Sequence, residues 1–172
     1  MFTPLVRLLM AILGLSLIIV YFQKGSTQSA YITLFGVALI IWGYFKNGTV
    51  YLAWQKIKKQ DFAKAEKILL QTKYPHFLKK EQRGFYHFTK GLVEASKNNS
   101  ENARRNFMEA LKFGVRTENN VAIINLNLAE IEAERGNINE AKLHLQKMRS
   151  MKYNPSWESE ITKIENKINI VQ

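Results

Sequence analysis

Apolar residues dominate the first forty-five positions of the chain, and a regular alternation with polar residues begins only afterwards. One apolar run, 5–22, contains a single charge, Arg7, and a second run, 29–45, contains none. A helix needs roughly 20 mostly apolar residues to cross about 30 Å of hydrocarbon. The pattern therefore predicts an N-terminal transmembrane hairpin, 1–45, with two spans at about 5–22 and 29–45.

The segment between the two runs is short and polar, which requires the two helices to be antiparallel. Gly36 and Gly43 are separated by two helical turns and share a helix face, and together with Ala11 and Gly14 they allow close packing of the two helices. The alternative is that glycine is simply common in such helices. A cleaved signal peptide is a competing interpretation of the first run, but no A-x-A-like site follows it.

Positive charge is concentrated next to the second apolar run. Residues 46–90 hold 11 Lys and Arg against three Asp and Glu, whereas residues 91–172 hold 12 against 11. The positive-inside rule then places both termini in the cytoplasm. We expect an integral protein of a membrane, and the frequent Asn, Lys and Ile favour a bacterial inner (plasma) membrane. The absence of cysteine excludes disulfides, thiolate metal sites and a Cys nucleophile.

One amphipathic helical pattern occurs three times along the chain at a constant spacing. The three units cover roughly 46–79, 84–117 and 122–155. A single helix pair cannot bury its apolar face alone, so three pairs are expected to stack around a continuous core. Small residues and, four positions later, large apolar residues stand in register: Ala65, Ala103 and Ala141, then Leu69, Phe107 and Leu145.

This pattern resembles the tetratricopeptide repeat. That family has a small residue midway along the first helix, a second one twelve positions later, then a large apolar residue and another small one. Gly91, Ala103, Phe107 and Ala110 match all four positions in the second unit. The resemblance implies an all-α fold, an α-solenoid of three helix pairs. The spacing of 38 departs from the family's 34 and implies longer helices or longer loops between units.

The last apolar stripe predicts a capping helix at 156–171, which closes the C-terminal domain 46–172. Pro155 ends the preceding unit, and Ser156 is the expected N-cap. The stripe follows helical spacing and would cover the exposed face of the third unit. Its members are Trp157, Ile161, Ile164, Ile168 and Val171.

The sequence contains little that indicates catalysis. No two of its three histidines lie at a helical i, i+4 spacing, and no Gly-rich phosphate loop occurs. Glu130 and Glu134 share a helix face, as a metal pair would, although such a pair is far more often solvated or faces a groove. We expect no catalytic residue, no metal and no cofactor, and we do not expect an enzyme.

The resemblance implies that the first helix of each unit lines a concave groove for a protein partner. An apolar groove with an acidic end suits an amphipathic helix or an extended apolar peptide. The alternative is that about half of these residues belong to the core. Family members that clamp a C-terminal carboxylate use basic and amide side chains, and of the matching positions here only Asn127 suits that role, which argues against such a ligand. The expected groove residues are Trp54, Phe85, Phe88, Leu92, Ile123, Leu126 and Glu130.

A basic patch next to the second span, formed by Lys46, Lys56, Lys58 and Lys59, is expected to contact anionic lipid headgroups of the bilayer. Nucleic acid is not expected, because basic and aromatic residues do not interleave as on an RNA-binding platform. The predicted function is that of a membrane-anchored adaptor or assembly factor. The alternative is a structural subunit of a larger membrane complex, held mainly through its transmembrane hairpin.

Overall fold

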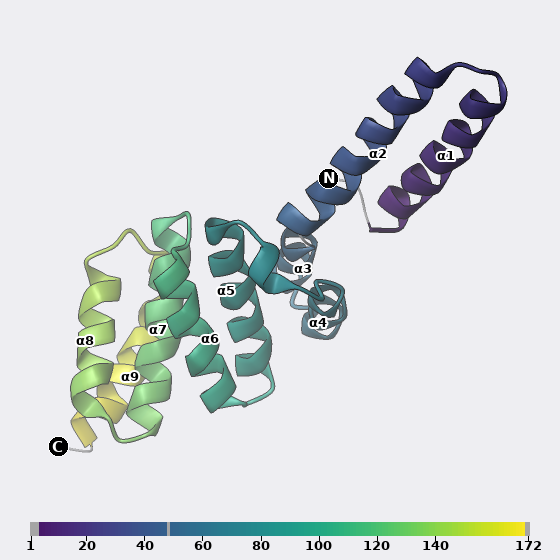
Figure 1. Ribbon diagram of the computed structural model, residues 1–172. Coiled ribbons are helices and arrows are strands. Elements are labelled where there is room, and N and C mark those ends of the chain that lie inside the picture. The colour runs from purple at the N-terminus through teal and green to yellow at the C-terminus, as the bar shows by residue number, and fades with distance from the viewer. Residues whose placement is uncertain (1–3, 48, 171–172) are drawn as a thin grey trace.

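A computed structural model describes residues 4–47 and 49–170, and every regular element in these ranges is helical. The side chains of residues 4, 5, 7, 8, 43–47 and 170 lie outside the description. The chain is therefore all-α over its described length, as expected (Figure 1). Its elements are α1 (Pro4–Gln23), α2 (Thr27–Asn47), α3 (Val50–Ile57), α4 (Phe62–Leu70), η1 (Pro75–Phe77), α5 (Lys80–Ser96), α6 (Ser100–Phe113), α7 (Glu118–Glu134), α8 (Ile138–Arg149), η2 (Pro155–Trp157) and α9 (Glu158–Ile170).

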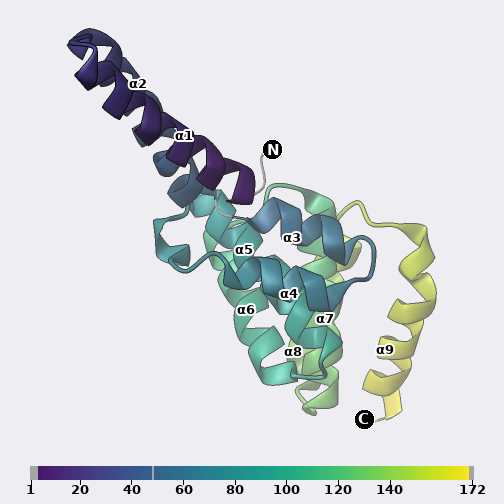
Figure 2. The same ribbon diagram turned by 90° about the vertical axis from the view of Figure 1, so that its right-hand side faces the viewer.

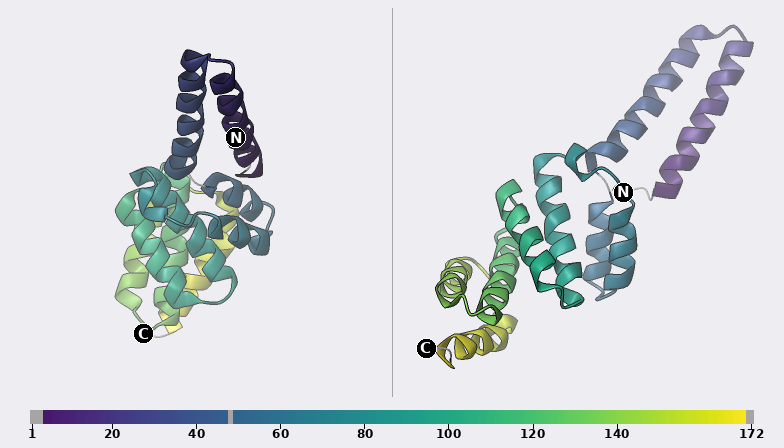
Figure 3. Two further views of the ribbon diagram at one scale, coloured as in Figure 1. Left: turned by 45° about the vertical axis from the view of Figure 1, so that its right-hand side comes forward. Right: turned by 60° about the horizontal axis from the view of Figure 1, so that its bottom comes forward.

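The chain divides into a hairpin, α1 and α2, and an array of stacked helices, α3 to α9. The two hairpin helices lie side by side and project away from the array in every view (Figures 1 and 3). They are joined by a turn in which Gly25 has a φ of +70°, a left-handed conformation that favours glycine. This link is shorter than expected, because the helices extend into the polar segment.

The seam of the hairpin confirms part of the predicted close packing. A Cβ atom added to Gly14 would lie 2.4 Å from Cγ2 of Val37, so a larger residue would require the Val37 side chain or the helices to move. Around Gly36, by contrast, such an atom meets nothing within 4 Å, and that glycine does not mediate close packing. The side chain of Ala11 is half-buried. Gly43 lies outside the described side chains.

Within the described residues, no helix combines the length and the apolar character that crossing a membrane requires. The runs expected at 5–22 and 29–45 do form helices, with ends within two residues of those of α1 and α2. Their insertion in a membrane stays a prediction.

The array consists of three neighbouring helix pairs, α3 with α4, α5 with α6 and α7 with α8, followed by α9, which packs against α7 and α8 (Figure 2). The turns inside the three pairs have one geometry. Gln60, Asn98 and Gly136 occupy equivalent positions of the three units, and all have positive φ, at 58°, 58° and 77°. The three units that repeat in sequence therefore also share one backbone conformation at this turn.

Close helix packing within each pair explains the small residues of the repeat. Ala65, Ala103 and Ala141 are fully buried. A Cβ atom on Gly91 would lie 2.6 Å from two ring carbons of Phe107, so α5 and α6 touch at this point without any room for a side chain. Helices α5 and α7 have 17 residues each, which accounts for part of the long spacing.

Helix α9 covers the end of the array as predicted. Ile161, Ile164 and Ile168 are buried in one cluster with residues of α7 and α8. Ser156, expected as the N-cap, lies inside the 3-10 turn η2 that precedes α9. The N-cap of that turn is Asn154, whose side-chain oxygen accepts a hydrogen bond from the Ser156 backbone N–H at 3.0 Å. Val171, expected at the end of the stripe, lies outside the described residues.

Candidate protein-interaction surface

Three of the predicted groove residues form an aromatic cluster where α3 meets α5. The Trp54 ring centroid lies 5.6 Å from that of Phe85 and 5.2 Å from that of Phe88, and the two phenylalanine rings are 5.9 Å apart. Trp54 and Phe85 remain half-buried, but Phe88 is fully buried. The expectation that Phe88 lines the groove is therefore wrong, because its side chain belongs to the core between α5, α6 and α7.

Leu92 and Ile123 extend this surface toward the third pair. Both are half-buried and pack against the same core cluster as Trp54 and Phe85. Leu126 is wrong as a groove residue, since it is buried in a different cluster, beneath α9. The residues that the structure brings together and leaves partly accessible are Trp54, Phe85, Leu92 and Ile123, here called the aromatic face.

Glu130, expected at the acidic end of the groove, is half-buried on α7, and its charge acts on Glu160 of α9. Burial, and secondarily the charge of Glu130, raises the pKa of Glu160 above its usual value, although Lys163 opposes the shift. Two carboxylates thus share one region, where a positive group of a partner would be stabilised.

Glu134, which shares a helix face with Glu130, pairs with a lysine of the cap. Its carboxylate accepts a hydrogen bond from Lys167 of α9 at 3.2 Å. Among the described residues, no group of three His, Asp or Glu side chains is placed to hold a metal ion.

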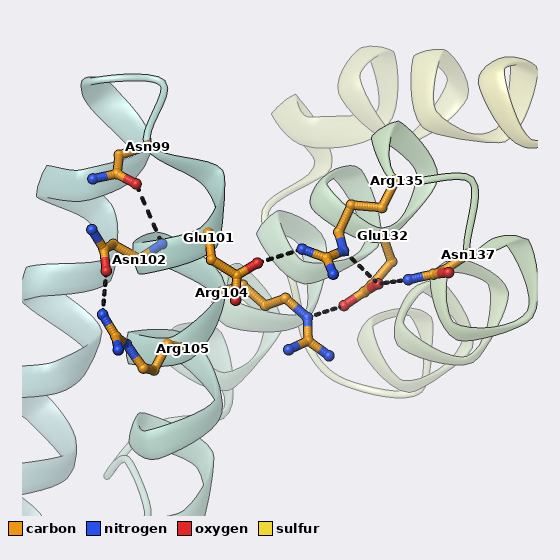
Figure 4. Close-up of polar contacts among 8 residues, drawn as sticks. All are labelled: Asn99, Glu101, Asn102, Arg104, Arg105, Glu132, Arg135 and Asn137. Carbon is orange, nitrogen blue, oxygen red and sulfur yellow. Dashed lines mark hydrogen bonds and ion pairs between the residues drawn. The ribbon is translucent and has the colours of Figure 1, made fainter.

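A carboxylate that the sequence analysis did not single out, Glu132, joins the second and third helix pairs. Its side chain is only 2% exposed and accepts hydrogen bonds from Arg104 of α6 and, at 2.7 Å, from Asn137 (Figure 4). Arg135 lies 3.8 Å from it and also pairs with Glu101 of α6. Burial raises the pKa of Glu132, but the hydrogen bonds and the nearby Arg charges outweigh that effect and hold it below its usual value.

The sequence did contain a signal for Glu132. Glu94 is its equivalent in the second unit and accepts a hydrogen bond at 3.0 Å from Asn99, five positions further along the chain, as Glu132 does from Asn137. The glutamate–asparagine spacing therefore repeats in the second and third units, whereas the first unit has Lys56 and Asp61 at the equivalent positions. It fixes the turn in the second and third pairs, and in the third pair Glu132 also binds Arg104.

Two histidines serve as ties between helices of one pair. Nδ1 of His87 lies 3.0 Å from Oδ1 of Asn106, and Nδ1 of His144 lies 2.9 Å from Oδ1 of Asn125. The two ties occupy equivalent positions of the second and third units, with histidine and asparagine exchanged. Burial lowers the pKa of both imidazoles, which favours their neutral form. These contacts give both side chains a structural role.

The predicted basic patch is only partly at the end of the hairpin. Lys56, Lys58 and Lys59 line a surface depression with Tyr51 and Gln55. Helix α3 leads away from the end of α2 (Figures 1 and 3). Lys56 is the seventh of its eight residues, roughly 9 Å from Val50 along the helix axis at 1.5 Å per residue, and Lys58 and Lys59 follow the helix. The three lysines therefore lie at the end of α3 that is farther along the chain from the hairpin, and their contact with lipid stays a prediction. The Lys46 side chain lies outside the description.

No protein-family model matches this chain, and neither a curated protein nor a solved structure is significantly similar to it.

Proposed function

We propose that this protein is a membrane-anchored adaptor or assembly factor. In this proposal the hairpin lies in a lipid bilayer, the array is a tetratricopeptide-like solenoid on the cytoplasmic side, and the aromatic face holds a segment of a protein partner. The observation that carries the proposal is an apolar hairpin joined directly to a folded helical array whose aromatic face stays partly open.

The pattern of exposure in the hairpin supports its insertion in lipid. In α1 the less exposed positions between 9 and 23 form one stripe, at Ala11, Gly14, Ile18 and Tyr21, and Gly14 of this stripe faces Val37 of α2. The remaining described side chains are mostly large and apolar, and they are exposed. A soluble protein rarely leaves so large an apolar surface uncovered, and hydrocarbon is the environment that suits it. The exposed residues include Leu9, Ile12, Leu13, Leu15, Leu17, Ile19, Phe22, Ile32, Leu34, Phe35, Leu39, Ile41 and Trp42.

Two hydroxyl groups of the hairpin are bonded within their own helix. The Ser16 hydroxyl donates to the carbonyl oxygen of Ile12 at 3.1 Å, and the Thr33 hydroxyl donates to that of Ser29 at 2.9 Å. Internal bonding of this kind is what a helix needs where no water is at hand. Thr89 and Thr162 of the array are bonded in the same way, so the bonds satisfy the hairpin hydroxyls without identifying their environment.

The aromatic face supports the binding of an apolar helix or extended peptide. Half-buried aromatic and aliphatic side chains on rigid helices are the usual anchors of such contacts. Glu130 and Glu160 near the far end favour a partner segment that carries a basic residue there. The ion pairs of Glu132 tie the second pair to the third, and these two pairs carry Phe85, Leu92 and Ile123 of this surface.

Site-specific photo-crosslinking in native membranes tests the adaptor. A crosslinking amino acid at Ile123, on the aromatic face, is expected to capture one partner reproducibly. The matched position is Leu143 on α8, an exposed leucine away from that face, where the same partner is not expected. With the purified partner, Ile123→Lys should weaken binding at least tenfold and Leu143→Lys should not. Equal capture at both positions, or equal affinity of both variants, would overturn the proposal.

The alternative, a structural subunit held through the hairpin, is supported by the large apolar surface of α1 and α2. Replacing 1–45 by an unrelated two-span hairpin discriminates the two functions. The adaptor keeps its partner after the exchange, because the aromatic face is unchanged. The structural subunit loses its complex.

A further inference from the structure

A loop of the first helix pair is tied to the base of the hairpin. Thr49 follows α2 by two residues, and its backbone N–H donates to the hydroxyl of Thr72 at 3.2 Å. The two hydroxyl oxygens are 3.0 Å apart, and the Thr49 hydroxyl also donates to the Ile68 carbonyl at 2.6 Å. Both threonines are buried. The chain that follows Thr72 is therefore held beside the end of α2.

This segment, residues 71–79, is called the base loop. Buried Thr72 and buried Leu78 fix its two ends. Between them Tyr74 is 52% exposed and Phe77 is 61% exposed, and Leu70, just before the loop, is 71% exposed. Figures 1 and 3 show the loop next to the lower end of α2 in each view.

The exposed rings of the base loop form a fixed group. The Tyr74 ring centroid lies 6.0 Å from that of His76 and 6.1 Å from that of Phe77, and the last two are 4.3 Å apart. The Arg83 side chain donates a hydrogen bond to the His76 carbonyl and so holds the 3-10 turn from behind. The loop thus presents its apolar tip through local contacts, and that tip lies outside the core cluster of the first pair.

Positive charge surrounds these rings. Lys73, Lys79 and Lys80 are all exposed, and Glu81 is the single acidic residue between 70 and 83. Aromatic rings flanked by lysine are typical of the membrane–water interface, where the rings sit at headgroup depth and the amines meet phosphate. A bilayer surface that carries anionic headgroups is complementary to both features.

We propose that the base loop is a second membrane contact, in which Leu70, Tyr74 and Phe77 enter the interface and the three lysines bind anionic phospholipid headgroups. The proposal rests on the insertion of the hairpin proposed above, which brings the loop to the bilayer. Two attachment points, the hairpin and the loop, would fix the tilt of the array over the membrane.

The absence of cysteine allows a direct test by spin labelling of the full chain in vesicles. Single nitroxides are placed at His76→Cys in the base loop, at Leu13→Cys in the middle of α1 and at Leu143→Cys on α8, all at exposed positions. Accessibility to oxygen and to a water-soluble nickel chelate gives the depth of each label. We expect hydrocarbon depth at position 13, headgroup depth at position 76 and bulk solvent at position 143.

Lipid charge provides the second arm of the test. The label at position 76 should lie deeper in vesicles of phosphatidylcholine with 30% phosphatidylserine than in phosphatidylcholine alone, and Lys73→Gln, Lys79→Gln and Lys80→Gln together should remove the difference. A matched triple change of exposed lysines in α8 and α9, at Lys142, Lys147 and Lys163, should leave it unchanged.

The outcomes separate the two proposals. Solvent exposure at position 13 would refute the insertion of the hairpin. Hydrocarbon depth at position 13 together with solvent exposure at position 76 would refute the base-loop contact alone. If the label at position 76 lies at headgroup depth and that depth does not change when the three lysines are replaced by glutamine, the proposed recognition of anionic lipid is overturned.

Discussion

Gly91 gives a sharp test of the packing in the repeat, because its two physical effects have opposite signs. Replacing glycine by alanine inside a helix normally stabilises a protein by about 1 kcal/mol. Here the added Cβ would lie 2.6 Å from two ring carbons of Phe107 and 3.1 Å from a third. The ring is fully buried, so it cannot move away without disturbing its neighbours. Overpacking of this kind costs about 1–3 kcal/mol.

We therefore expect Gly91→Ala to lower the free energy of unfolding by up to about 2 kcal/mol, the balance of these two effects. The other two units show how the clash is avoided. At the positions equivalent to Gly91 and Phe107 they carry Ala53 with Leu69 and Ala129 with Leu145. The chain thus pairs glycine with phenylalanine and alanine with leucine.

A double-mutant cycle makes the reasoning quantitative. In a Phe107→Leu background, Gly91→Ala should be neutral or stabilise the protein by up to about 1 kcal/mol, which gives a coupling energy of about 1–3 kcal/mol between the two positions. The measurement is chemical denaturation of the detergent-solubilised full chain, followed by far-ultraviolet circular dichroism. A gain of about 1 kcal/mol from Gly91→Ala in both backgrounds would show that the ring does not occupy this space.

Three further changes test other parts of the array. Glu132→Gln removes a buried charge that Arg104 and Asn137 bind. It should lower the free energy of unfolding by about 2 kcal/mol in the same assay. An unchanged free energy of unfolding would contradict the ion-pair arrangement. Ile164→Ala opens a cavity beneath the capping helix α9 and should lower the free energy of unfolding by about 2–5 kcal/mol. Backbone amides of α9 and α7 should then exchange hydrogen faster. Exchange rates equal to those of the native chain would argue against the buried cap. Burial lowers the folded-state pKa of His87 and His144. The unfolded chain therefore binds protons more readily, and stability should fall as pH drops below about 6.5, which thermal unfolding between pH 8 and pH 5 measures.

Local pattern determined the elements of this protein. Two apolar runs, of which only the first contains a charge, Arg7, form two helices. The ends of these helices lie within two residues of the predicted spans. The threefold repeat predicted the three pairs, since its small and large residues keep their spacing wherever a helix pair of this kind forms. The apolar stripe of the cap placed Ile161, Ile164 and Ile168 correctly in the core. All of these features depend on periodicity along one helix, which the sequence states directly.

The burial of individual side chains depended on contacts between helices. Leu126 lies on α7, where nine residues are buried and the pattern does not distinguish a groove side from a core side. Phe88 lies on α5, three positions after half-buried Phe85, and only the packing of α6 and α7 against it decides which of the two rings is fully buried. Glu132 appears as one of three neighbouring glutamates, yet it alone is buried by Arg104 and Asn137.

The composition of the base loop follows from the sequence, but its position in the fold does not. Lys73, Tyr74 and Phe77 are plain in the sequence as a polar and aromatic segment after the second helix of the first pair. Only the hydrogen bonds between Thr49 and Thr72, which are distant in the chain, bring that segment to the end of α2. Which segments are helical and how they repeat could be read from the amino-acid order, because those properties are local. Which faces remain open and which loop lies beside the hairpin could not, because such positions depend on contacts between residues far apart in the chain.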